Sequence, residues 1–216
     1  VKERFRYWSA LALLRGVMSS PAAGYEMLIN RMGKIAEDTV PDAEISNPVL
    51  DDDFSSDGDY VPNYILEQTD WSETQTKRLR ELAQSINALR GFKEDLKSDH
   101  LFHVLYAWIN DDFHPIVFCR YIATAKYLGE LIKPRLEEIF PDVEVQVVTS
   151  EDHDDIRRHR IEAMGKAKKR VLIATDCLSE GINLQDLFTA VLHYDCLLYT
   201  SPSPRDRTRS RMPSSA

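Results

Sequence analysis

Three apolar runs in the second half of the chain each lead directly into polar or ionisable residues. The runs end at Cys119, Val148 and Ala174. The residues that follow are Arg120 and Tyr121 after the first run, Thr149 and Ser150 after the second, and Thr175, Asp176, Glu180, Gly181, Asn183 and Gln185 after the third. Gly181 allows a backbone to approach a phosphate or a sugar closely. We therefore expect a ligand-binding edge where these stretches meet.

The apolar runs must be neighbouring strands for their ends to meet. Each run is short and bounded by polar or proline residues, which is typical of a strand buried on both faces. Helical patterns separate the runs, and this alternation predicts an α/β fold with a parallel sheet that binds ligands at its carboxyl edge. The predicted elements are strands at 116–119, 143–149, 171–174 and 189–193 and helices at 123–140 and 154–164, with Pro134 kinking the first helix or starting another.

The sequence before Pro115 predicts helices only. Residues 1–35 predict two helices, with Ser20 as the cap of the second and Pro21 in its first position. Further helices are expected at 72–90, before Gly91, and at 95–109. The faces expected to be buried contain Phe5, Trp8, Leu11, Ala12, Leu14, Tyr25, Leu28, Ile29, Met32, Leu79, Leu82, Ile86, Leu89, Leu96, Phe102, Leu105, Tyr106 and Ile109.

Composition limits the classes of function. The chain has 216 residues, of which 43% are hydrophobic and 29% charged, as in globular proteins, and it has no apolar run long enough to span a membrane. Neither its cysteines nor its histidines have metal-ligand spacing, so we expect no bound metal and a location in the reducing cytoplasm. The net charge of −8 argues against a bulk electrostatic grip on nucleic acid, whereas local basic clusters remain compatible with one.

Two segments stand apart from this pattern. Residues 37–63 are acidic and rich in turn residues, and we expect a flexible insertion there rather than a metal site. Reverse translation of 196–206 and 210–216 fits the two ends of a transposase-type sequencing adapter, so we interpret 196–216 as translated adapter sequence. That segment has four arginines and one aspartate, a net charge of +3, so residues 1–195 carry −11 rather than −8.

The stretch from Arg170 to Gln185, Arg-Val-Leu-Ile-Ala-Thr-Asp-Cys-Leu-Ser-Glu-Gly-Ile-Asn-Leu-Gln, resembles motif V of superfamily 2 helicases in the form of bacterial Swi/Snf-type proteins. Residues 115–128 resemble motif IV. Residues 147–158 resemble the motif that follows it, although that motif commonly has Gly where Ser150 stands. The helical sequence before Pro115 is similar to the region that joins the two motor lobes of these proteins. The order and spacing of the three motifs make the resemblance more specific than any one of them.

The resemblance implies a fragment of an ATP-dependent helicase or translocase acting on nucleic acid, with double-stranded DNA as the expected substrate. It implies a helical region at 1–113 and a truncated second RecA-like domain at 114–195, whose partner is a missing first RecA-like lobe. ATP and Mg²⁺ are implied for the parent protein and not for this chain alone. By carry-over, the ATP-cleft residues of motif V are Thr175, Asp176, Glu180, Gly181, Asn183 and Gln185, and the residues facing nucleic-acid phosphates are Arg120, Thr149 and Ser150.

Several parts that ATP hydrolysis requires do not occur in this sequence. It has no Gly-x-x-x-x-Gly-Lys-Ser/Thr P-loop and no acidic box for magnesium, and no arginine-finger motif follows Asp195. We therefore expect no ATPase activity from this chain alone. Two alternatives stay open: a non-enzymatic α/β module that binds a nucleotide or effector at the same strand ends, and an RNA helicase fragment. The long region at 1–113 argues against the latter, whose linker between lobes is normally short.

Overall fold

The computed structural model describes residues 2–34, 73–175, 178 and 184–195. The described part before residue 90 is helical and consists of α1 (Lys2–Ser19), α2 (Pro21–Lys34) and α4 (Glu73–Asn87). The predicted insertion at 37–63, the start of the helix predicted at 72 and the segment at 196–216 lie outside the described residues. None of the described helices is long and apolar enough to cross a membrane.

The rest of the described chain is built on a parallel sheet. Its strands are β1 (Pro115–Phe118), β2 (Val143–Val148), β3 (Lys169–Ala174) and β4 (Ala190–His193), and they lie in the order β2-β3-β1-β4. Every pairing in this sheet is parallel. Each strand predicted from the sequence is present, with ends that differ by one or two residues. The α/β fold class is therefore confirmed.

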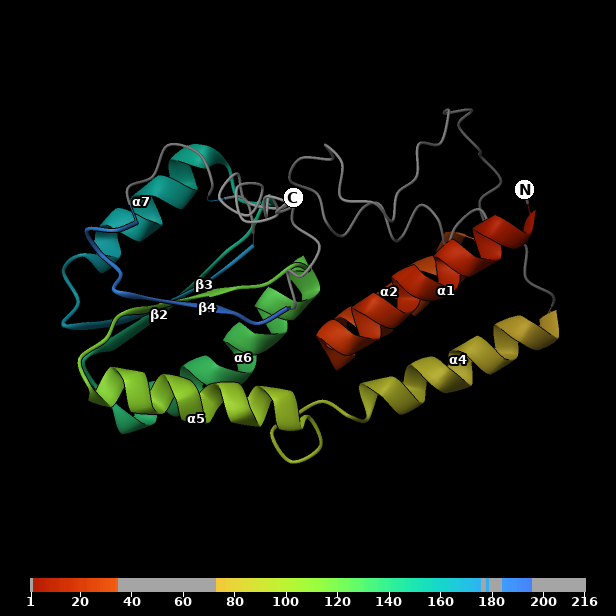
Figure 1. Cartoon of the computed structure of the whole chain (residues 1–216), viewed down its shortest axis with the longest axis horizontal. Coiled ribbons are helices and arrows are strands. Elements are labelled where there is room, and N and C mark those ends of the chain that lie inside the picture. The colour runs from red at the N-terminus through yellow and green to blue at the C-terminus, as the bar shows by residue number, and fades with distance from the viewer. Residues whose placement is uncertain (1, 35–72, 176–177, 179–183, 196–216) are drawn as a thin grey trace, which may run out of the picture.

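Helices cover both faces of this sheet, as Figure 1 shows. They are α5 (Leu96–Asn110), α6 (Ile122–Ile139) and α7 (Asp154–Met164). On one face, Leu105 of α5 and Leu128 of α6 pack in a core with Val117 and Val171 of the strands. On the other face, residues of α7 and the alternate strand side chains form a second core. β1 and β3 are largely buried on both faces, which explains why continuous apolar runs predicted them correctly, whereas β4 alternates between half-buried and exposed residues.

α1 and α2 form a hairpin that turns at Ser20. The hydroxyl oxygen of Ser20 accepts a hydrogen bond from the N–H of Ala23 at 3.1 Å, so Ser20 caps α2 as predicted. Pro21 occupies the first helical position, where no backbone N–H is needed. The cap and the proline together fix the point at which the chain reverses. The turn of the hairpin lies next to the sheet, and α4 packs along the hairpin (Figure 1).

Two glycines allow the helices of this hairpin to lie close together. A Cβ at Gly16 would overlap the sulfur of Met27. A Cβ at Gly24 would lie 2.8 Å from Cγ2 and 3.1 Å from Cα of Val17. The interface therefore depends on small residues, which a search for large apolar side chains at helical spacing does not detect.

Several predictions of buried helix faces were wrong. Leu14, Ile29, Leu82, Leu89, Leu96 and Tyr106 were expected to be buried and are exposed. In α4 the buried row is Leu79, Ala83 and Ile86, because the contact with the hairpin follows this narrow line of spacing four and three. In α5, Leu101 and Ser98 are buried in place of Leu96 and Tyr106. The periodicity predicted each helix, but the face that it predicted to be buried was wider than the observed contact face by about one residue on either side.

Pro134 and Gly91 also differ from expectation in detail. One helix, α6, runs through Pro134, so the alternative of a new helix starting there was wrong. Pro134 and Glu130, whose carbonyl loses its helical partner, are both exposed, and water can satisfy that carbonyl. α4 ends at Asn87, before Gly91, and Gly91 adopts a φ of 106° in the turn that leads to α5.

Candidate functional site

The carboxyl ends of the four described strands form one edge of the sheet, which we call the rim. Backbone hydrogen bonds continue one residue beyond the strands, because the N–H of Cys119 donates to Ala174 O at 2.8 Å and that of Thr175 donates to Val148 O at 3.3 Å. The N–H of Tyr194 likewise donates to Phe118 O at 2.9 Å. The residues of the rim, in the order of the strands, are Thr149 and Ser150, Thr175, Cys119 to Tyr121, and Tyr194 and Asp195.

The rim gathers four of the residues expected to contact ligands. Arg120 and Ser150 are half-buried, whereas Thr149 and Thr175 are buried. Arg120 and Ser150 are thus the more accessible pair. Gln185 is exposed in a turn, and Leu187 of the same turn lies beside Gly165 at the end of α7. The remaining motif V residues, Asp176, Glu180, Gly181 and Asn183, lie outside the part of the chain that the structure describes.

The loop after β2 is held by helices on both faces of the sheet. The N–H of Thr149 donates to Asp152 Oδ2 at 3.3 Å, and Asp152 also pairs with Arg160 of α7 at 3.0 Å. Glu151 pairs with Lys126 of α6 at 2.6 Å, and this hydrogen bond raises the pKa of Lys126. The backbone around Thr149 and Ser150 is therefore fixed in position by charged partners that are themselves partly exposed.

Asp195, which sequence reasoning did not select, is a central residue of the rim. It lies two residues after the end of β4 and is buried. Its Oδ2 accepts a hydrogen bond from the backbone N–H of Arg120 at 2.7 Å, and its Oδ1 lies 3.2 Å from the Nζ of Lys97. Lys97 also lies over the ring of Tyr194, with Nζ 3.9 Å from the ring centroid. The ends of β1 and β4 are thus joined to each other and to α5.

Three buried hydroxyl groups connect the rim to the helical hairpin. The hydroxyl oxygen of Thr124, in the first turn of α6, lies 2.7 Å from those of both Ser19 and Ser20. All three residues are buried. Nothing in the local sequence singles out this contact, because its partners are separated by 104 and 105 positions in the chain.

A buried carboxylate, Asp95, anchors the start of α5. One of its oxygens accepts from the N–H of Ser98 at 3.2 Å and the other from the hydroxyl of Tyr127 at 3.1 Å. The Tyr127 oxygen in turn accepts from the N–H of Gly91 at 2.9 Å. Burial is the main cause that raises the pKa of Tyr127 and that of Tyr194. Both phenols therefore stay protonated at neutral pH, and Tyr127 serves as a hydrogen-bonding group rather than a base.

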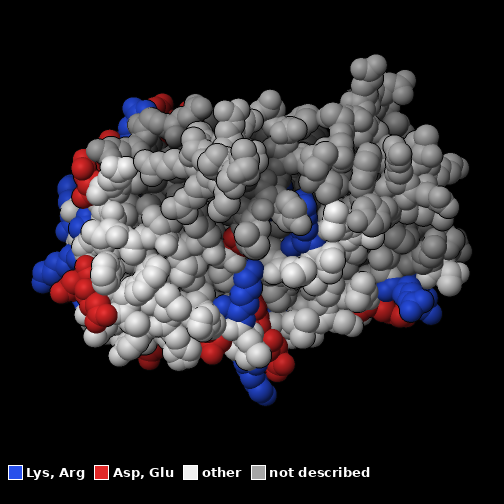
Figure 2. All heavy atoms as spheres, in the orientation of Figure 1, with Lys and Arg blue, Asp and Glu red and all other residues white. Residues whose placement is uncertain are grey.

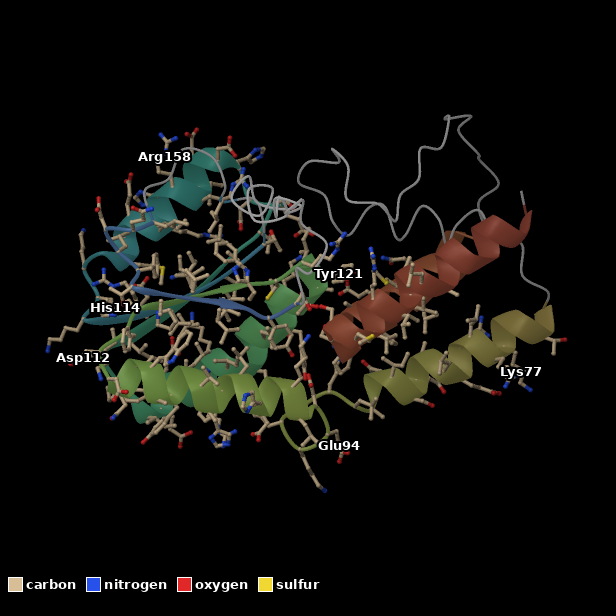
Figure 3. All side chains as sticks on the ribbon, viewed as in Figure 1. Lys77, Glu94, Asp112, His114, Tyr121 and Arg158 are labelled. Carbon is tan, nitrogen blue, oxygen red and sulfur yellow. The ribbon has the colours of Figure 1, made fainter. Side chains whose placement is uncertain are left out.

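A second polar group lies at the opposite edge of the sheet. Figure 3 shows His114 and Asp112 at the strand starts, far from Tyr121 at the rim. Burial, followed by the charge of Arg170, lowers the pKa of His114, while Asp112 acts in the opposite direction. Among the described residues, Nδ1 of His114 and Nε of Arg170 are buried without a hydrogen-bond partner. This group is separate from the rim.

The described residues provide no site for a metal ion. No three of their His, Cys, Asp or Glu side chains are arranged to hold one. On the face shown in Figure 2, basic and acidic side chains alternate along the described surface and form no single basic face.

The parallel sheet, with helices on both faces and polar groups at the strand ends, defines an α/β protein of RecA-like fold with a helical N-terminal region. Residues 97–208, more than half of the chain, match the family model described as "Helicase conserved C-terminal domain". The chain belongs to this family, the C-terminal domain of superfamily 2 helicases. The matched range begins at Lys97, the second residue of α5, and extends past Asp195. Comparisons with curated proteins and with solved structures gave no significant match.

Proposed function

We propose that this chain is the second RecA-like lobe of a Swi/Snf-type, ATP-driven motor on double-stranded DNA, together with the helical region that joins the lobes. The observation that carries the proposal is the rim, where a member of the helicase C-terminal family brings Arg120, Thr149, Ser150 and Thr175 to one edge of a parallel sheet. Hydroxyl, guanidinium and backbone groups bind phosphates without reading base sequence, as a translocating motor requires.

The helical region supports the Swi/Snf-type assignment over an RNA helicase. The hairpin and α4 precede the sheet and pack as a substantial helical unit against α6 and the rim. An RNA helicase of this superfamily normally has a short linker at this place. We infer that the helical unit sets the orientation of the lobe relative to a first lobe.

We propose that the first lobe provides most of the contacts that bind ATP and Mg²⁺. The sequence has no P-loop, and its described residues have no cluster of metal-binding carboxylates. Motif V, of which Thr175 lies on the rim, would border the nucleotide from this side. The chain would thus supply one wall of an ATP cleft, and we expect it to act in the reducing cytoplasm.

Binding of nucleic acid by the chain itself tests the proposal. A short fluorescein-labelled DNA duplex and the matching RNA duplex are titrated at several salt concentrations, and fluorescence anisotropy gives the dissociation constants. We expect the DNA duplex to bind more tightly. Arg120→Ala should weaken binding by about tenfold and lower the dependence of log K on log salt by about one unit, because one phosphate contact is lost.

Lys168→Ala is the matched control. Lys168 precedes β3 at the opposite edge of the sheet and is exposed, so its replacement removes the same charge away from the rim. We expect the control to change affinity less than twofold or so. Equal effects of Arg120→Ala and Lys168→Ala would contradict binding at the rim, and tighter binding of the RNA duplex would favour the RNA helicase.

A further inference from the structure

The ammonium group of Lys97 lies at the point where the hairpin meets the rim. Its Nζ donates to the carbonyl oxygens of Met18 at 3.1 Å and of Ser19 at 2.9 Å, and to Asp195 Oδ1 at 3.2 Å. An ammonium group has three N–H donors, so these three acceptors satisfy it fully. Met18 and Ser19 end α1, where carbonyl groups have no helical partner and a positive charge is favourable. Lys97 therefore caps α1 and pairs with the rim at the same time.

Asp195 completes the connection. Its second oxygen accepts from the N–H of Arg120 at 2.7 Å, the residue that leads from β1 toward α6. One carboxylate oxygen of Asp195 therefore binds Lys97, which contacts the hairpin, and the other binds the backbone N–H of Arg120. The hydroxyls of Ser19, Ser20 and Thr124 form a second set of hydrogen bonds, which joins the hairpin to α6 beside the rim. We call Lys97, Asp195, Ser19, Ser20 and Thr124 the hairpin joint.

The arrangement differs from an ordinary surface ion pair. Lys97 is 40% exposed, and an isolated pair of that exposure would contribute little. Asp195 is only 9% exposed, however, and a buried carboxylate that loses a partner is unfavourable. Two backbone carbonyls and a backbone N–H are also involved, so the joint fixes main-chain positions as well as side chains.

We propose that Asp195 is a positioning residue that holds the Arg120 backbone on the rim. We further propose that Lys97 couples the position of Asp195 to that of the α1–α2 hairpin. A displacement of the Arg120 loop by a ligand is then transmitted to the helical region through one carboxylate and one ammonium group. The consequence for DNA binding rests on the proposed function, whereas the positioning itself does not. Arg120 would face its phosphate correctly only while Asp195 holds its N–H.

Two substitutions at Asp195 distinguish its hydrogen bond with the N–H of Arg120 from its ion pair with Lys97. Asp195→Asn keeps an oxygen that accepts from the N–H of Arg120 but loses the charge that pairs with Lys97, whereas Asp195→Ala loses both. Lys97→Met keeps an aliphatic stem of similar length and removes the three donors. Lys133→Met is the matched control, because Lys133 forms an exposed ion pair with Glu137, at 3.8 Å, within α6.

Amide hydrogen exchange of the full chain, resolved by residue, gives the first test. Asp195→Ala should speed exchange at Arg120 by about tenfold or more, and Asp195→Asn by less than about threefold. Lys97→Met should speed exchange of the hairpin-turn amides of Ser20 and Ala23 while leaving Arg120 protected. Unchanged exchange at Arg120 in folded Asp195→Ala would overturn the proposal. So would a uniform increase over the whole sheet in Lys97→Met, or equal effects from Lys133→Met.

The second test uses the labelled DNA duplex. Asp195→Ala should weaken binding about as much as Arg120→Ala, and the double variant should be no weaker than either single one. Additive losses would overturn the claim that Asp195 acts through Arg120. If the unsubstituted chain binds no duplex, the proposed function fails, while the exchange measurement still decides the positioning role.

Discussion

Replacement of Thr124 by Val tests how firmly the hairpin is seated on the sheet. Valine has the shape of threonine, so it removes the hydroxyl without opening a cavity. Ser20 retains the N–H of Ala23 as a partner, whereas Ser19 loses the group that lies 2.7 Å from its hydroxyl. A buried hydroxyl left unpaired is unfavourable by about 1–3 kcal/mol. We expect Thr124→Val to lower the free energy of unfolding by about 2 kcal/mol, measured by urea denaturation followed by circular dichroism.

A double-substitution cycle gives the control. Ser19→Ala removes the partner hydroxyl, so the double variant Ser19→Ala/Thr124→Val has neither group left unpaired. We expect the double variant to lose less stability than the sum of the single variants, by about 1 kcal/mol. Thr124→Ser, which keeps the hydroxyl, should lose only about 1 kcal/mol for the missing methyl group. Wild-type stability in Thr124→Val, or strict additivity in the cycle, would refute the assigned role of these hydroxyls.

Other predictions concern the hairpin and the opposite edge of the sheet. Gly24→Ala should destabilise the fold by about 1–3 kcal/mol and more than Gly16→Ala, because the new methyl group meets the backbone of Val17 rather than the flexible end of Met27; urea denaturation of both variants measures the difference, and the reverse order would contradict this packing. The pKa of His114 is lowered in the fold, so the unfolded chain binds more protons and stability should fall as pH drops below about 6.5. Thermal melts across that range should show a smaller loss for His114→Gln, and an equal loss in both proteins would exclude His114 as the cause.

The strands and the rim were predictable because their signals are local. Residues 171–174 are apolar and buried on both faces, and the polar residues at 175 and 149 follow their strands immediately. Parallel pairing then brings these ends to one edge whatever the details of the helices. The order of the strands in the sheet was not predicted, because nothing local specifies that β3 lies between β1 and β2.

The hairpin joint could not be predicted from the sequence. Lys97 and Asp195 are 98 positions apart, and each alone has the pattern of an ordinary polar residue at the end of an element. The hairpin interface was missed for a related reason. Its close contact depends on Gly16 and Gly24, whereas the large residue Leu14 faces solvent. Periodicity of large apolar residues identifies a helix, but it does not identify which side chains are small enough to permit contact.

Phosphate release from ATP tests the central proposal most directly. It is measured, with and without duplex DNA, for this chain alone and for the same chain joined to a lobe with a P-loop and to an arginine-finger motif, the two parts that its own sequence does not contain. We predict no release above the buffer blank from the chain alone and DNA-stimulated release from the joined protein. DNA-stimulated release by the chain alone, or none from a folded joined protein with an intact P-loop and arginine finger, would contradict the assignment as the second lobe of a DNA motor.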